Sequence, residues 1–64
     1  MKNKIRELRK KMGLRQEDLA VTLGVTRQTI NAIENNKYNP SLELAMKLAK
    51  LLHIPVEALF TLEE

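Results

Sequence analysis

The sequence predicts an all-α fold, a compact bundle of five helices. Apolar residues recur at helical spacing in five short segments, and residues that favour helix starts and ends stand between them. No segment shows the strict alternation of a half-buried strand, although the last residues leave room for a short extended tail. With 64 residues and no cysteine, the chain is expected to form one domain, residues 1–64, with a small core.

The first helix is predicted from Ile5, Leu8 and Met12, which form one stripe at positions i, i+3 and i+7. Asn3 is placed to cap its start. Gly13 stands where a left-handed residue would end the helix.

The next two helices are predicted over residues 16–23 and 27–35, with about three residues between them. Gly24 supplies the bend, and Thr26 is placed to cap the second of the two helices. A connection this short makes the helices cross steeply instead of running antiparallel. The pattern over residues 16–35 is therefore that of a helix-turn-helix.

Ser41 is expected to cap a fourth helix, which His53 ends, and Pro55 opens a short fifth helix. The buried stripe expected of the fourth helix consists of Leu42, Ala45, Leu48, Ala49 and Leu52. The apolar face of the fifth consists of Val56, Leu59 and Phe60.

Basic residues gather at the start of the chain. Residues 1–15 contain seven basic residues and one acidic residue, whereas residues 16–64 contain four and seven. This asymmetry indicates an anionic partner near one end of the domain. A solvated helix face with cations near its C-terminal end accounts for the charge equally well, so composition alone leaves both explanations open.

Several classes of function find no support in the residues. His53 is the only histidine and there is no cysteine, so neither a metal site nor a cofactor is expected. Ser41 has no matching base and no glycine-rich phosphate loop is present, so the chain is not expected to be an enzyme or to have a small-molecule substrate. Without a signal peptide or a long apolar run, we expect a cytoplasmic protein that does not enter a membrane.

The third helix carries an unusual polar face. Ile30 and Ile33 fix its buried side, and a rotation of about 100° per residue points Gln28, Asn31 and Asn35 outward. Side-chain amides, like arginine, can read base edges in the major groove of DNA. Each amide alone is more simply a solvated residue. Their shared face beside a basic segment favours a DNA-binding helix.

The run LRQEDLAVTLGVTRQTINAIENNKYNPSLELAMKLAKLL resembles the Cro and phage-repressor type of helix-turn-helix regulators, also called the xenobiotic-response-element family. The resemblance covers residues 4–60. Within it, TRQTINAIENNKYNPSL is most similar to the short stand-alone members, of which the cytolysin repressor is an example. The resemblance implies a homodimeric, sequence-specific repressor whose third helix reads a palindromic operator in the major groove of double-stranded DNA.

The resemblance also implies residue roles. The expected base contacts are Thr26, Arg27, Gln28, Asn31 and Ala32. The expected phosphate contacts are Gln16, Thr29, Asn35, Asn36, Lys37 and Tyr38, together with Arg15, which stands where Ser or Thr commonly caps the second helix. Gln16 would also brace Gln28, and Tyr38 could instead pack on the fourth helix. Arg9 and Glu34 match a structural ion pair of the family.

Residues 55–64 are the expected dimer interface, formed by Val56, Leu59, Phe60 and Leu62. The resemblance implies the same location, because short members of the family dimerise through their C-terminal end. The alternative is that Phe60 folds back into the core of its own monomer. A rival function is an antitoxin-like protein-interaction module with secondary DNA binding; only four residues follow Phe60, which argues against a toxin-binding extension.

Overall fold

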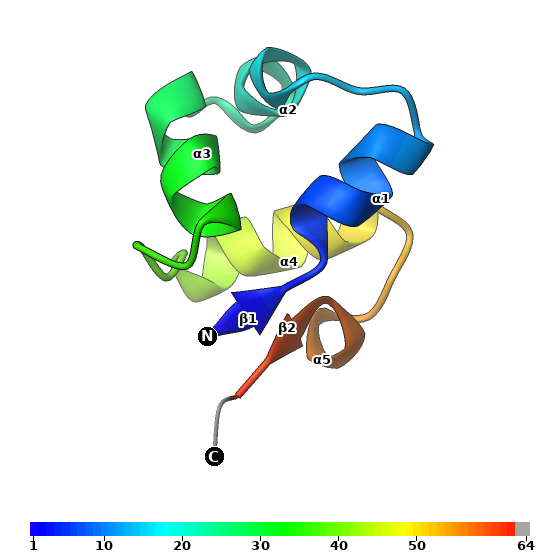
Figure 1. The fold of residues 1–64 in the computed structure, drawn as a ribbon, viewed down its shortest axis with the longest axis vertical. Coiled ribbons are helices and arrows are strands. Elements are labelled where there is room, and N and C mark those ends of the chain that lie inside the picture. Colours follow the sequence, from blue (N-terminus) through cyan, green and yellow to red (C-terminus); the bar gives the residue numbers. More distant parts are fainter. Residues whose placement is uncertain (63–64) are drawn as a thin grey trace.

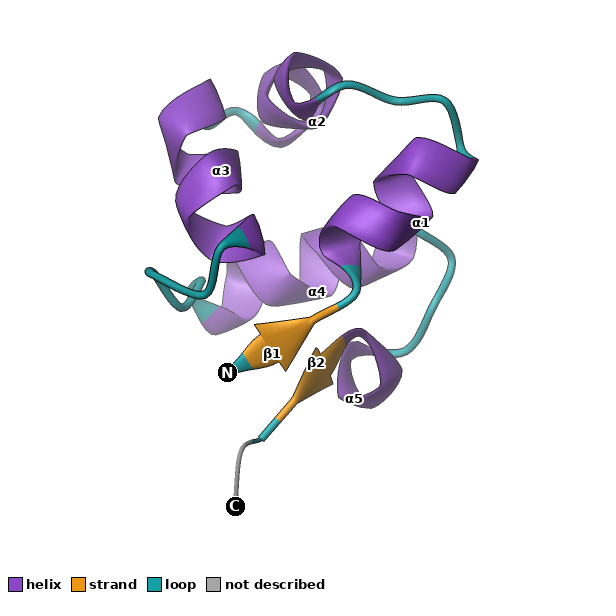
Figure 2. Ribbon diagram, in the orientation of Figure 1, coloured by secondary structure: helices purple, strands orange, loops and turns teal. Residues whose placement is uncertain are grey.

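The five predicted helices are present in the computed structural model, which describes residues 1–62 (Figure 1). The helices are α1 (Ile5–Lys11), α2 (Gln16–Leu23), α3 (Arg27–Glu34), α4 (Leu42–Leu51) and α5 (Val56–Leu59). Two very short strands accompany them, β1 (Lys2–Asn3) and β2 (Phe60–Thr61) (Figure 2).

The core draws on every helix. In Figure 1, α4 passes behind α1 and α3, and α5 lies beside β2 at the end of the molecule where the strands are. The side chains with almost no exposed surface are Ile5, Leu19, Ile30, Ile33, Leu48 and Leu59, at least one from each of the five helices. Since each helix contributes to a single apolar cluster, the orientation of α3 depends on the packing of the other four.

A two-stranded antiparallel sheet joins the two ends of the described chain, which the sequence did not predict. Lys2 pairs with Thr61, and Asn3 pairs with Phe60. The backbone N–H of Lys4 continues the contact by donating to the carbonyl of Leu59 at 3.0 Å. A strand of two residues is too short to display alternating polarity, so no pattern could reveal it. The pairing with β1 holds β2 against the rest of the domain.

Each of the first four helices ends on a residue in the left-handed conformation. The residues and their φ angles are Gly13 (71°), Gly24 (71°), Asn36 (60°) and His53 (58°). In each case the following N–H returns to a carbonyl five residues earlier; for α3, Lys37 donates to Ala32 at 2.9 Å. His53 thus ends α4, as predicted, through its backbone conformation. Asn36 adopts a turn that glycine would adopt more easily.

Four details of the predicted elements were wrong. Phe60, expected on the apolar face of the fifth helix, lies in β2. Leu42 is 73% exposed, because it lies about 70° around α4 from the centre of the buried stripe and occupies the first helical position. Pro55 is the residue before α5, not the first within it. Asn3 lies in β1 rather than at the N-cap of α1, although its Oδ1 still accepts the N–H of Ile5 at 3.1 Å.

Candidate nucleic-acid interface

α2 and α3 form the predicted helix-turn-helix. Figure 1 looks nearly along the axis of α2, whereas α3 runs across the view, so the two axes are steeply inclined. Gly24 supplies the left-handed residue at the turn, and the Thr26 hydroxyl accepts the N–H of Thr29 at 3.2 Å, which caps α3. Ile30 and Ile33 bury the opposite side of α3 in the core. The outer face of α3 is therefore held in a defined orientation.

That outer face carries the expected base-reading residues. Arg27, Gln28 and Asn31 are exposed, and Ala32 is partly exposed. Within residues 1–62, the side chains of Arg27 and Gln28 form no hydrogen bond or ion pair. Their donors and acceptors are thus available to a partner outside the chain, unlike those of most polar residues around them.

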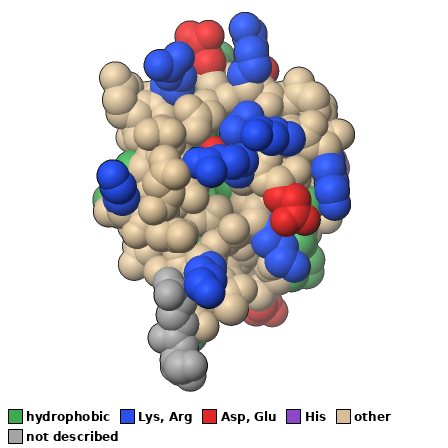
Figure 3. All heavy atoms as spheres, viewed as in Figure 1, with side chains coloured by type: hydrophobic (Ala, Val, Ile, Leu, Met, Phe, Trp, Pro, Cys, Tyr) green, Lys and Arg blue, Asp and Glu red, His purple; other side chains and the backbone are tan. Residues whose placement is uncertain are grey.

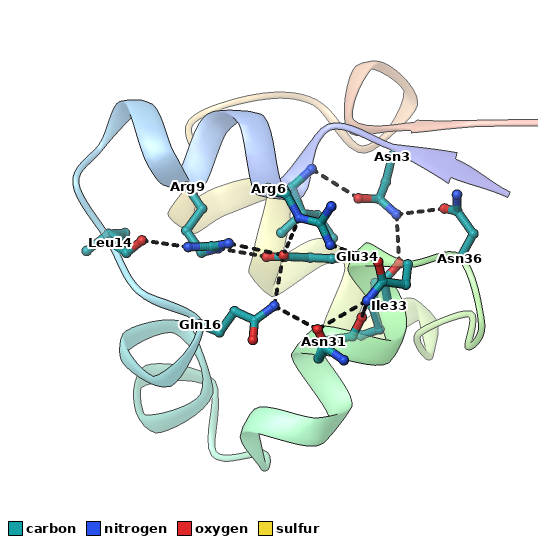
Figure 4. A network of polar contacts seen from close by, with 11 residues as sticks. Asn3, Arg6, Arg9, Leu14, Gln16, Asn31, Ile33, Glu34 and Asn36 are labelled. Carbon is teal, nitrogen blue, oxygen red and sulfur yellow. Dashed lines mark hydrogen bonds and ion pairs between the residues drawn. The ribbon is translucent and has the colours of Figure 1, made fainter.

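Glu34, at the end of α3, is the centre of a polar network (Figure 4). Its side chain is 0% exposed, and Arg9 of α1 binds it through two contacts, Nε to Oε2 at 2.8 Å and Nη2 to Oε1 at 3.2 Å. Arg9 also donates through Nη1 to the carbonyl of Leu14 at 2.9 Å. The ion pair expected between Arg9 and Glu34 is present, and it ties α1 to α3.

Two further donors reach the same carboxylate. Nε2 of Gln16 lies 3.1 Å from Oε1 of Glu34, and Nε of Arg6 lies 3.3 Å from it. Gln16 also donates to Oδ1 of Asn31 at 3.1 Å. Gln16 thus contacts Asn31 and Glu34, which lie one turn apart on the same side of α3. The prediction that Gln16 braces Gln28 was therefore wrong.

The pKa of the Glu34 carboxyl group is lowered. Burial alone would raise this pKa by penalising the charged form, but the hydrogen bonds from Arg9, Gln16 and Arg6 and the charge of Arg9 outweigh it. Glu34 is therefore ionised at neutral pH, where it can only accept hydrogen bonds.

Arg15 precedes α2 without capping it in the usual way. Instead Oδ2 of Asp18 accepts the backbone N–H of Arg15 at 2.7 Å, and the Arg15 side chain lies 3.3 Å from Oδ1 of Asp18. These contacts, led by the backbone hydrogen bond, lower the pKa of Asp18, and the hydrogen bond to Asp18 raises the pKa of Arg15. The Arg15 side chain remains largely exposed at the start of α2.

Four of the remaining expected phosphate contacts follow the C-terminal end of α3. Asn35, Asn36, Lys37 and Tyr38 are all exposed. Tyr38 and Thr29 also line a surface pocket of about 320 Å³ together with Leu44 of α4. Tyr38 thus faces the same pocket as Leu44 and is 51% exposed.

Sequence reasoning missed Arg6. Its guanidinium bonds Glu34 and also donates through Nη2 to Oδ1 of Asn35 at 2.8 Å, so it reaches the exposed end of α3. The available signal was the spacing of Arg6 and Arg9, since residues three apart share one face of a helix. Figure 3 shows that basic side chains outnumber acidic ones on the face it presents, the one that displays α1 and α3 in Figure 1.

The expected dimer residues are divided between core and surface. Leu59 has no exposed area and Phe60 is 8% exposed, so both belong to the core of the monomer. Val56 is partly buried, and Leu62 is 70% exposed. Phe60 therefore follows the alternative in which it folds back, and only Val56 and Leu62 remain available to a second copy.

The described part of the chain, residues 1–62, contains no helix long and apolar enough to cross a membrane.

Comparison with known proteins assigns the family. The helix-turn-helix family model matches residues 5–59. The chain is 53% identical over 64 residues to the uncharacterized HTH-type transcriptional regulator YgzD of Bacillus subtilis, covering all of this chain and 97% of that protein. It is 40% identical over 57 residues to the cryptic phage CTXphi transcriptional repressor RstR of Vibrio cholerae, covering 89% of this chain and 51% of RstR.

Among solved structures, the restriction-modification controller protein C.AhdI from Aeromonas hydrophila matches with a TM-score of 0.77 and 41% identity, over 88% of this chain and 85% of that one. The relatives and the fold are those of transcriptional regulators, which are not enzymes. The chain belongs to the Cro and phage-repressor type of helix-turn-helix family and is a DNA-binding transcriptional regulator.

Proposed function

We propose that this regulator is a homodimeric repressor that reads a palindromic operator. Two copies of α3 would enter successive major grooves, about 34 Å apart on one face of the duplex. A repressor acts by occupying its operator, and the name of the RstR relative, a transcriptional repressor, supports that sign of regulation. We place the protein in the cytoplasm, where such an operator would be reached.

The observation that carries this proposal is the outer face of α3. Arg27 and Gln28 are exposed near its N-terminus, and neither side chain has a partner within residues 1–62. Arg is suited to guanine, and Gln is suited to adenine, each through two hydrogen bonds. Ala32 is small enough to let the helix lie deep in the groove or to touch a thymine methyl group. We assign base contact to Thr26, Arg27, Gln28, Asn31 and Ala32.

Phosphate contacts would flank this face. We assign them to Arg15 and Gln16 at the start of α2, to Thr29, and to the four residues Asn35, Asn36, Lys37 and Tyr38. Phosphate contacts fix the position of the protein on the duplex but carry no sequence information. The basic residues of α1 would add affinity that falls as salt rises.

A second copy would cover the exposed apolar side chain of Leu62 and the exposed part of Val56. A closed dimer uses the same patch on both subunits, and its two-fold axis matches the symmetry of a palindrome. Because Leu59 and Phe60 already belong to the monomer core, the interface is expected to be small and the dimer to depend on protein concentration.

The proposal is tested by selecting duplexes from a random pool with the purified protein. We expect an enriched palindrome whose half-sites are about 10 base pairs apart, centre to centre. Enrichment of a single, asymmetric half-site would contradict the dimer, and the absence of any enriched sequence would contradict sequence-specific binding.

A further inference from the structure

We infer that Asn31 reads its base as a hydrogen-bond donor only, which selects the guanine edge and excludes the two-bond contact with adenine. The inference rests on the proposed function and specifies the chemistry of one contact within it. It follows from the orientation of the two side-chain amides that contact Asn31, those of Gln16 and Asn35, within the polar network around Glu34 (Figure 4).

The first constraint comes from Glu34. This ionised carboxylate has no hydrogen to donate, so the atom of Gln16 that lies 3.1 Å from Oε1 must be the amide nitrogen. The same nitrogen lies 3.1 Å from the terminal Oδ1 of Asn31. Two amide nitrogens facing each other would both donate, so the Asn31 atom facing Gln16 is its oxygen.

The second constraint comes from Arg6 and is independent of the first. A guanidinium can only donate, so the Asn35 atom that lies 2.8 Å from Nη2 of Arg6 is the amide oxygen. The nitrogen of Asn35 therefore points the other way, where it lies 3.1 Å from Oδ1 of Asn31 and 2.9 Å from the Asn31 carbonyl. Both constraints assign the same orientation to Asn31.

The two constraints determine which side-chain atom of Asn31 remains free to bind a base. An amide oxygen has two lone pairs, and Gln16 and Asn35 occupy both. Within residues 1–62, Nδ2 of Asn31 has no acceptor, and the residue is exposed on the outer face of α3. A two-bond contact with adenine needs an acceptor for N6 and a donor to N7, whereas guanine presents the acceptors N7 and O6. Asn31 can satisfy guanine without releasing either of its neighbours.

The test compares the base preferences of the wild type with those of Asn31→Asp, using selection from a random pool. In this variant one oxygen keeps the bonds from Gln16 and Asn35, and the other presents an acceptor to the groove. At one position of each half-site we expect the preference to change from guanine to cytosine, whose N4 group is a donor. A correct pair is expected to be favoured about 5- to 150-fold over the mismatched base.

A second variant removes the two side-chain hydrogen bonds to the Asn31 oxygen. The double substitution Gln16→Ala with Asn35→Ala leaves the Asn31 oxygen free, and adenine should then be accepted at the same position. Both residues are also assigned to phosphates, so overall affinity should fall, but loss of a phosphate contact does not change base preference. The matched control is Asn36→Asp, which introduces the same charge beyond α3 and keeps the acceptor for Asn3. Because Asn36 is assigned to a phosphate, this variant should weaken binding to every sequence and leave every base preference unchanged.

The outcomes separate the inference from the proposed function. A wild-type preference for adenine at the position that Asn31→Asp alters would overturn the inference. So would an Asn31→Asp variant that binds every sequence more weakly with an unchanged preference. In both cases selective binding by the wild type would leave the proposed function standing. If the wild type selects no sequence, the proposed function fails and the inference fails with it.

Discussion

Arg9 in α1 and Glu34 in α3 form a two-pronged ion pair, with Nε to Oε2 at 2.8 Å and Nη2 to Oε1 at 3.2 Å. The pair is almost completely buried, and Arg6 and Gln16 share its carboxylate. It connects the basic first helix to the end of α3. The orientation of the outer face of α3, to which we assign base contacts, therefore depends on a contact that is not itself part of that face.

Removing one partner of this pair should be far more costly than removing both. Arg9→Met leaves the Glu34 carboxylate buried without its main partner and should lower the free energy of unfolding by about 3–5 kcal/mol. The double variant Arg9→Met with Glu34→Leu replaces two charges by apolar groups and should recover much of that loss. Urea denaturation of both variants measures the difference. A double variant less stable than Arg9→Met alone would show that the network around Glu34 matters more than its charge.

The stability of the domain should decrease in acid because of Glu34. Its pKa is lowered in the folded state, so near pH 4 the unfolded chain binds more protons, and stability rises with pH. The contribution is complete above the unfolded pKa of about 4.3, and it is lost as the pH falls through the folded value. Asp18 has a lowered pKa too and acts in the same direction.

Unfolding measured from pH 7 to pH 2 isolates the part due to Glu34. The Glu34→Gln variant should be less stable than the wild type at pH 7, and the two curves should converge in acid. Asp18→Asn is the control for the second carboxylate with a lowered pKa, which is only partly buried. Parallel curves for the wild type and Glu34→Gln would show that Glu34 contributes nothing to the acid sensitivity.

His53→Gly should stabilise the domain. His53 has a φ of 58°, a left-handed conformation that costs an ordinary residue about 1–2 kcal/mol and glycine almost nothing. Part of this gain is offset because glycine makes the unfolded chain more flexible, so we expect an increase of about 1 kcal/mol in the free energy of unfolding. Gly24→Ala is the converse control, since a Cβ at Gly24 meets no atom within 4 Å and only backbone strain opposes it. Thermal denaturation should move in opposite directions for the two variants.

The residues proposed to read bases and those proposed to bind phosphates should differ in how they affect specificity. Arg27→Ala and Gln28→Ala should each weaken binding to the operator by about 1–3 kcal/mol and relax the preference at one position of each half-site. Lys37→Ala should weaken all sequences alike and reduce the slope of log affinity against log salt by about 0.9. Titrations on the operator and on single-base variants of it distinguish the two effects. Equal losses on every sequence for all three variants would contradict direct readout by α3.

Leu62→Glu should weaken the dimer without unfolding the monomer. The Leu62 side chain is 70% exposed in the monomer, so the substitution leaves the core intact, but it would place two like charges at the proposed interface. Sedimentation over a range of concentrations should show dissociation at higher concentration than for the wild type, with an unchanged helical circular dichroism spectrum. Unaltered association would move the interface away from the end formed by α5 and β2.

Sequence reasoning succeeded where a feature is local. Helical spacing and caps such as Thr26 and Ser41 depend on neighbouring residues, and the structure has both caps where they were predicted. It failed where two distant segments meet. The pairing of β1 with β2 joins residues near opposite ends of the chain, and no local pattern predicts it.

The same limit applies to the outer face of α3. The outward direction of Asn31 follows from the rotation of a helix, but the orientation of its amide depends on Gln16 and Glu34, which belong to different helices. Leu42 was expected to be buried and is exposed. Helical spacing alone does not reveal where along a helix the core ends.

The most direct test of the central claim is a titration of the purified protein onto the selected palindromic duplex and onto a shuffled duplex of the same composition, at low and at near-physiological salt. We predict that binding saturates at two chains per duplex and that selectivity for the palindrome increases as salt rises, since base contacts remain when the phosphate contribution is screened. Equal binding to both duplexes that disappears with salt would contradict the claim that α3 reads sequence.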